Sequence, residues 1–86
     1  MNTSATVKWT EHIGSMVVDS AIQVHRELGP GLLESTYQAC LAMELRRAAL
    51  RVQTEVKLPV EYKGHRIEVG YRIDMIVEGL VVVENK

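Results

Sequence analysis

The spacing of apolar residues along the chain changes near residue 51, from a helical repeat to a strict alternation. In the first part, apolar and small residues recur at intervals of three and four, which indicates one face of a helix. Thr10 is the expected N-cap of this helix, and Glu11 then lies favourably against the helix dipole. Gly29-Pro30-Gly31 is expected to end the helix after Leu28. The stripe consists of Ile13, Met16, Val17, Ser20, Ala21, Val24 and Leu28.

A second helix is predicted from about Leu32 to Leu50. Its apolar face carries Tyr37, Cys40, Leu41, Leu45 and Ala48. Three arginines gather near its C-terminal end, where cations complement the helix dipole. They are Arg46, Arg47 and Arg51.

Residues 51–62 alternate between apolar and polar side chains, which predicts a half-buried strand. Pro59 cannot donate a backbone hydrogen bond, so it favours an edge position or an irregularity there. Lys63-Gly64 predicts a tight turn. The second strand, residues 66–77, alternates in the same way, and Gly70 within it is a candidate bulge.

The third predicted strand follows a turn at Glu78-Gly79 and runs over residues 80–86. Leu80–Val83 is apolar on both faces, which is typical of a strand inside a sheet that is covered on both sides. The expected fold is therefore α+β: two N-terminal helices, then a three-stranded antiparallel sheet in one domain over residues 1–86. Two helices cover only one sheet face, and no cap or turn precedes the end at Lys86. The chain is therefore expected to be the N-terminal part of a larger fold, or to be completed by another chain. The alternative is a complete two-helix, three-strand domain.

Composition narrows the class of protein. The chain has 86 residues, 47% of them hydrophobic and 24% charged, as expected for one small globular domain. The longest apolar run is far shorter than a membrane helix, and residues 1–8 lack the apolar core of a signal peptide. With one cysteine, no internal disulfide is possible, and a cytoplasmic location is expected.

Charge is unevenly distributed along the chain. The net charge is −2 over residues 1–43, +3 over residues 44–72 and −2 over residues 73–86, which sum to the overall −1. This pattern is not that of a strongly electrostatic DNA-binding protein. It suits carboxylates that hold a metal beside basic groups that meet phosphate, and equally an ordinary solvated surface.

Four ionisable residues could form a reactive centre. Asp74 interrupts the apolar run 73–77, and Glu84 lies at an equivalent level of the expected hairpin. Paired carboxylates at that level could bind a hard divalent cation. Lys86 shares the face of Glu84 and could activate water or stabilise phosphate charge. Glu34 could join from the start of the second helix. The alternatives are a helix-dipole role for Glu34 and a solvated chain end for Glu84-Asn85-Lys86.

Other residues with chemical potential have structural explanations. His12, His25 and His65 lack metal-ligand spacing. Cys40 lies on an apolar helix face and favours packing. Tyr37 could orient Glu34 or serve helix packing.

The segment Gly31–Tyr37 matches the Gly-x-x-Glu-x-x-Tyr signature, and the chain from about residue 10 to 86 resembles the GxxExxY family of the PD-(D/E)XK nuclease-like superfamily. Further segments resemble the family in the same order: 24–30, Glu44-Leu45-Arg46, Leu58-Pro59-Val60, Tyr62-Lys63-Gly64 and Tyr71-Arg72-Ile73-Asp74. Members of the family continue past the Glu-x-Lys strand into another helix and strand, and many carry Gln where Glu55 stands.

The resemblance implies a metal-dependent phosphodiesterase site on a mixed sheet with flanking helices. By position, it implies Glu34 as the helix carboxylate, Asp74 and Glu84 as ligands of Mg²⁺ or Mn²⁺, and Lys86 as the catalytic lysine. The expected activity is hydrolysis of a nucleic-acid phosphodiester. The alternative is a non-catalytic module of the same fold that binds protein or nucleic acid as a homo-oligomer.

Overall fold

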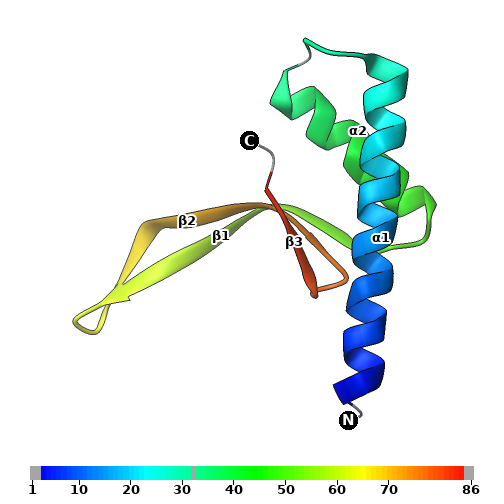
Figure 1. Ribbon diagram of the computed structural model, residues 1–86. Coiled ribbons are helices and arrows are strands. Elements are labelled where there is room, and N and C mark those ends of the chain that lie inside the picture. Colours follow the sequence, from blue (N-terminus) through cyan, green and yellow to red (C-terminus); the bar gives the residue numbers. More distant parts are fainter. Residues whose placement is uncertain (1–2, 32, 85–86) are drawn as a thin grey trace.

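The computed structural model describes residues 3–31 and 33–84 and shows two helices followed by an antiparallel sheet (Figure 1). The three strands lie in the order β1-β2-β3 and each is antiparallel to its neighbour. The α+β class and the order of elements are as predicted. The elements are α1 (Thr3–Leu28), α2 (Glu34–Arg47), β1 (Val52–Tyr62), β2 (His65–Val77) and β3 (Val81–Val83).

Helix α1 begins at Thr3, two turns before the predicted start. Thr10 therefore lies inside the helix and is not its N-cap, and Glu11 is not in the first turn. The prediction was wrong because no Pro or Gly separates Thr3 from Thr10, so nothing in the backbone prevents the helix from extending in the N-terminal direction.

Helix α2 ends at Arg47, whereas the sequence predicted an end at Leu50. Ala49 adopts a left-handed conformation, with φ of 66°. The N–H of Leu50 donates to the carbonyl of Leu45, and the N–H of Ala49 donates to that of Arg46. These two bonds form a Schellman motif, which usually has glycine where Ala49 stands. The apolar contact that accompanies such motifs is provided here by two buried leucines, Leu45 and Leu50.

The hydrophobic core lies between the two helices and one face of the sheet. Tyr37 ties the helices together, since its hydroxyl donates to the carbonyl of Ala21 at 3.3 Å. Val81 and Val83 of β3 pack at the margin of the core. The buried residues are Ile13, Val17, Val24, Leu41, Ala42, Leu45, Leu50, Met75 and Val77.

Strand β3 lies at the edge of the sheet that the described residues form, and not inside it as predicted. Val82 of β3 pairs with Ile76 on the face opposite the core and is 55% exposed. The prediction that the apolar run forms a strand is confirmed. Both helices pack on the face that carries Val81 and Val83, so the face that carries Val82 is left uncovered. Residues 85–86 of the predicted strand lie outside the described residues.

The irregularity predicted at Pro59 and Gly70 is confirmed. The β1–β2 register shifts between Leu58 and Val60, so that β2 has two more residues than β1 at this point. The β1 backbone approaches β2 so closely that a Cβ at Gly70 would overlap the carbonyl oxygen of Leu58. Glycine is therefore needed here for close approach. Strand β1 is an edge strand, as Pro59 predicted.

Beyond the helices, β1 and β2 continue as a long two-stranded hairpin (Figure 1). We call residues 56–73 the arm. Lys63 and Gly64 close it as a tight turn with φ of 49° and 78°. The Cα radius of gyration is 15.2 Å, against about 12 Å for a compact domain of this length. The arm therefore gives this chain more surface than its length requires.

Hydrogen bonds between Arg51, just before β1, and Glu78, just after β2, form a charged clamp at the open end of the β1–β2 hairpin. Glu78 accepts hydrogen bonds from the backbone N–H of Arg51 at 2.7 Å and from its Nε at 3.1 Å. The N–H of Glu78 in turn donates to the carbonyl of Arg51 at 2.8 Å. These bonds hold Glu78 in a left-handed turn with φ of 54°. The backbone N–H, and then the side chain, of Arg51 hold the pKa of Glu78 below its ordinary value of 4.5.

We expect the clamp to make the free energy of unfolding depend on pH. A carboxyl whose pKa is lower in the folded state stabilises the fold above its unfolded pKa, and that contribution is lost as pH falls through the folded pKa. Glu78→Gln should therefore be less stable than wild type at pH 7, and the difference should shrink below pH 4.5 and vanish once the pH is below the folded pKa of Glu78. Urea unfolding across this pH range measures it. The control is Glu11→Gln, which removes an exposed carboxylate of α1. Its stability should equal that of wild type at every pH.

Candidate functional site

Two of the predicted site residues, Glu34 and Asp74, line one cavity of about 400 Å³ between α2 and the β1–β2 hairpin. Glu34 is the first residue of α2, where a carboxylate is favoured by the helix dipole. Asp74 is half-buried and lies in β2 directly before Met75, whose side chain is fully buried in the core. The structure therefore brings together carboxylates that are 40 positions apart.

Basic side chains line the same cavity. Arg46 reaches it from α2 and Arg72 from β2. Arg46 donates to the carbonyl of Val52 at 3.0 Å, which fixes its guanidinium beside the start of β1. Arg72 lies 3.8 Å from a carboxylate oxygen of Glu55, a third acidic residue of the cavity. The cavity thus combines oxygen donors with guanidinium groups that suit phosphate.

The strand register places Glu84 next to Asp74, one of the residues that line the cavity. The last pair of the β2–β3 ladder is Met75 with Val83, so Asp74 and Glu84 are the next residues in the two antiparallel segments. This placement agrees with the equivalent hairpin levels expected from the sequence. Lys86, the fourth predicted site residue, lies outside the described residues.

The donor chemistry of the cavity fits a hard divalent cation. Glu34, Glu55 and Asp74 supply carboxylate oxygens, the ligands that Mg²⁺ and Mn²⁺ prefer. Within residues 3–31 and 33–84, no three His, Cys, Asp or Glu side chains are gathered closely enough to hold a metal ion. A complete ligand set would therefore have to include groups outside that part of the chain.

Tyr37, the last residue of the signature, serves helix packing and does not line the cavity. His25 lies edge-on to its ring, with the ring centroids 6.5 Å apart. Of the two roles that the sequence left open for Tyr37, the structure shows packing of α2 on α1. Tyr37 thus attaches to α1 the helix that begins with Glu34.

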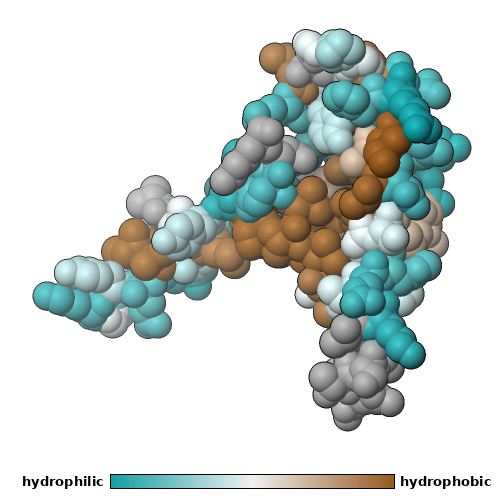
Figure 2. Space-filling view, in the orientation of Figure 1, coloured by the Kyte–Doolittle hydropathy of each residue, from teal (hydrophilic) through white to brown (hydrophobic). Residues whose placement is uncertain are grey.

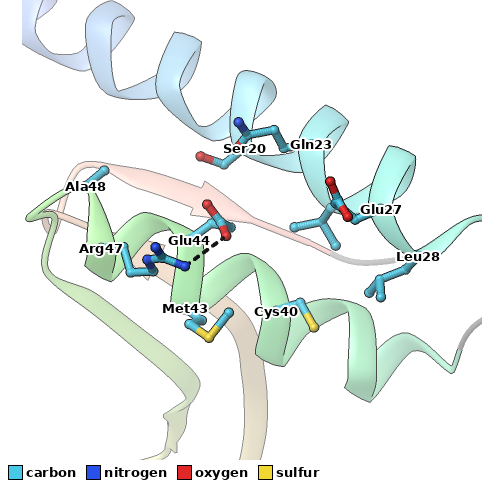
Figure 3. Close-up of a pocket in the computed structure, with 10 residues that line it drawn as sticks. Ser20, Gln23, Glu27, Leu28, Cys40, Met43, Glu44, Arg47 and Ala48 are labelled. Atoms are coloured by element: carbon cyan, nitrogen blue, oxygen red, sulfur yellow. Dashed lines mark ion pairs between the residues drawn. The ribbon is translucent and has the colours of Figure 1, made fainter.

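A larger cavity of about 640 Å³ lies between α1 and α2 (Figure 3). Its lining combines apolar side chains such as Leu28 and Met43 with the Glu44–Arg47 ion pair, in which the charged atoms are 4.0 Å apart. Of the predicted site residues that the structure describes, Glu34, Asp74 and Glu84, none lines this cavity. Size alone therefore does not identify the site in this molecule.

Sequence reasoning missed several residues of the smaller cavity. Gln38 lies one helical turn after Glu34, and Arg72 lies two residues before Asp74 on the same strand. Both spacings place the residue on the same face as its partner, so they could have been found. Arg46 could not, because its role was assigned to the helix dipole and only tertiary packing brings it to β1.

A family model for the PD-(D/E)XK nuclease superfamily matches residues 11–86. The chain therefore belongs to the PD-(D/E)XK nuclease superfamily. The narrower GxxExxY assignment remains a prediction. No curated protein and no solved structure gave a match in the other two comparisons. Among the described residues, no helix is long and apolar enough to cross a membrane.

Proposed function

We propose that this chain is a metal-dependent nuclease domain that hydrolyses phosphodiester bonds in nucleic acid. The observation that carries the proposal is the cavity shared by Glu34 and Asp74, together with Arg46 and Arg72, in a chain of the PD-(D/E)XK nuclease superfamily. Nuclease chemistry needs oxygen ligands and cationic groups around one phosphate, and this cavity offers both.

In this proposal, Asp74 and Glu84 hold Mg²⁺ or Mn²⁺, with Glu34 as a further ligand. The bound cation would supply Lewis-acid stabilisation of charge on the phosphate. Lys86 would position the attacking water and take up its proton at Nζ, or stabilise negative charge on the phosphate. Arg72 and Arg46 would orient the phosphate by charge-assisted hydrogen bonds.

The test is cleavage of labelled DNA and RNA by the purified chain in Mg²⁺ or Mn²⁺, with EDTA as the blank. We expect cation-dependent cleavage, and a loss of at least about 100-fold in rate for Lys86→Ala. Lys57→Ala, an exposed lysine outside the cavity, is the matched control and should retain the rate. Cleavage that persists in EDTA, or equally in Lys86→Ala, would exclude this mechanism.

The second candidate is a nuclease-fold module without turnover that binds protein or nucleic acid as a homo-oligomer. It is favoured by the exposed apolar residues of the sheet, such as Leu58, Tyr71 and Val82. Mn²⁺ binding without cleavage of either nucleic acid would favour this candidate over the first.

A further inference from the structure

One face of the β1–β2 hairpin is apolar along almost its whole length. Directly opposed residues in an antiparallel pair point to the same face of the sheet. The register therefore places alternate residues of both strands on one face, from the core to the tip of the arm. The opposed pairs are Val52 with Val77, Thr54 with Met75, Val56 with Ile73, Leu58 with Tyr71, Val60 with Ile67, and Tyr62 with His65.

The helices cover only the inner part of this face. Met75 and Val77 are fully buried, and Val56 and Ile73 are half-buried. Further out, Tyr71 is 74% exposed. Figure 2 shows the hydrophobic surface that gathers where the sheet meets the helices and continues along the hairpin. We call the exposed outer part the apolar arm face; it consists of Leu58, Val60, Tyr62, Ile67 and Tyr71.

We propose that the apolar arm face binds the same face of a second copy of this chain, around a two-fold axis. An isologous contact needs a surface that complements itself. The charged pairs Lys57–Arg72 and Glu61–Arg66 fall on the opposite face of the hairpin by the same register. Two apolar arm faces can therefore meet without bringing these four charged side chains together.

The same distribution of charge argues against nucleic acid as the occupant. A surface that binds the phosphate backbone presents its lysines and arginines to it. Here Lys57, Arg66 and Arg72 lie on the other face, and Arg66 is already paired with Glu68 at 3.0 Å. Tyr62 and Tyr71 suit a protein interface, where tyrosine is enriched because its ring is apolar and its hydroxyl tolerates water.

The exposed area matches a small interface. An aromatic side chain has about 150–250 Å² of surface, so Tyr62 and Tyr71, at 62% and 74% exposure, present roughly 200–340 Å². With Leu58, Val60 and Ile67, the face reaches roughly 500 Å², and two copies would bury about 1,000 Å², the lower limit for a specific interface. The dimer is therefore expected to be weak and concentration-dependent.

The arm itself gives a second reason for a partner. A two-stranded hairpin is at best marginally stable alone in water, and a layer on its apolar face is what stabilises it. Packing of one arm on another supplies that layer at the usual spacing of about 10 Å between sheets. The proposed dimer would be the homo-oligomer of the second candidate function. It does not depend on nuclease activity.

The experiment is light scattering on the full chain from about 1 μM to about 1 mM. We expect the mass to rise from 9.7 kDa toward twice that value. Tyr71→Lys should weaken the dimer by at least about tenfold, because it places two ammonium groups across the axis. Gln53→Lys adds the same charge on the opposite face of the sheet and should dimerise like wild type. Circular dichroism checks that both variants are folded; if Tyr71→Lys is not, Tyr62→Lys decides.

Wild type that stays at 9.7 kDa over the whole range would overturn the proposal. So would equal dimerisation of the Tyr71 and Gln53 variants. A monomeric wild type that binds a fluorescent oligonucleotide, with affinity lost in Tyr71→Lys, would assign the face to nucleic acid. None of these three results measures cation-dependent cleavage, so the nuclease proposal is tested separately.

Discussion

Asp74→Asn is expected to abolish binding of Mn²⁺ while the domain remains folded. Asp74 is the carboxylate that joins the two parts of the proposed site, since it lines the cavity with Glu34 and precedes the β2–β3 pair that leads to Glu84. Asparagine keeps the volume and one oxygen but removes the charge that attracts a divalent cation. Changes to groups that only support metal ligands cost about 10–100-fold in affinity, so losing a ligand charge should cost at least about 100-fold.

Isothermal titration with Mn²⁺ measures the loss, and far-ultraviolet circular dichroism checks the fold. Glu61→Gln removes the same charge from the arm, where Glu61 is paired in register with Arg66, and should leave the affinity unchanged. Unaltered Mn²⁺ affinity in Asp74→Asn would contradict the metal site. A variant that unfolds would instead show that Asp74 has a structural role in β2.

The second large effect is expected in the core, at Leu45. This side chain is fully buried and belongs both to the packed face of α2 and to the motif that ends that helix. Leu→Ala at such a position costs about 2–5 kcal/mol, out of about 5–15 kcal/mol for a typical domain. Leu45→Ala should therefore lose a large share of its stability or fail to fold at 37 °C.

Urea unfolding at one fixed protein concentration measures this effect, because a dimer would make the midpoint depend on concentration. We expect the midpoint to fall by at least about 1 M urea. Leu33→Ala is the matched control: Leu33 precedes α2, is 74% exposed, and should change stability by no more than about 0.5 kcal/mol. A similar loss in both variants would mean that the core is not where the structure places it.

The hairpin was predictable in detail because each of its features has a local cause. Alternation gives the strands, Lys63-Gly64 gives the turn, and Pro59 with Gly70 gives the irregularity. The helix ends were not predictable to the same degree. Ala49 occupies a left-handed position that glycine usually marks, so its local signal for a helix end was absent.

The candidate site shows the same division. The signature and the break in an apolar strand identified Glu34 and Asp74, and the structure places both on one cavity. The sequence could not predict that Arg46 would reach β1, because that contact depends on how α2 packs against the sheet. The edge position of β3 was also missed. The strand is apolar on both faces, but that composition does not show whether one strand or two lie beside it.

The packing of β3 at the core margin links two distant parts of the chain. Val81 and Val83 pack against a core that includes Ile13 and Val17 of α1, nearly 70 positions earlier. The arm, by contrast, is built from strands joined by a two-residue turn and forms through local contacts, which are fast to make. During synthesis, the helices and the arm therefore leave the ribosome before β3 is available to complete the core. Until then, the nascent chain leaves the edge of β2 unpaired and the core without Val81 and Val83, which invites chaperone binding.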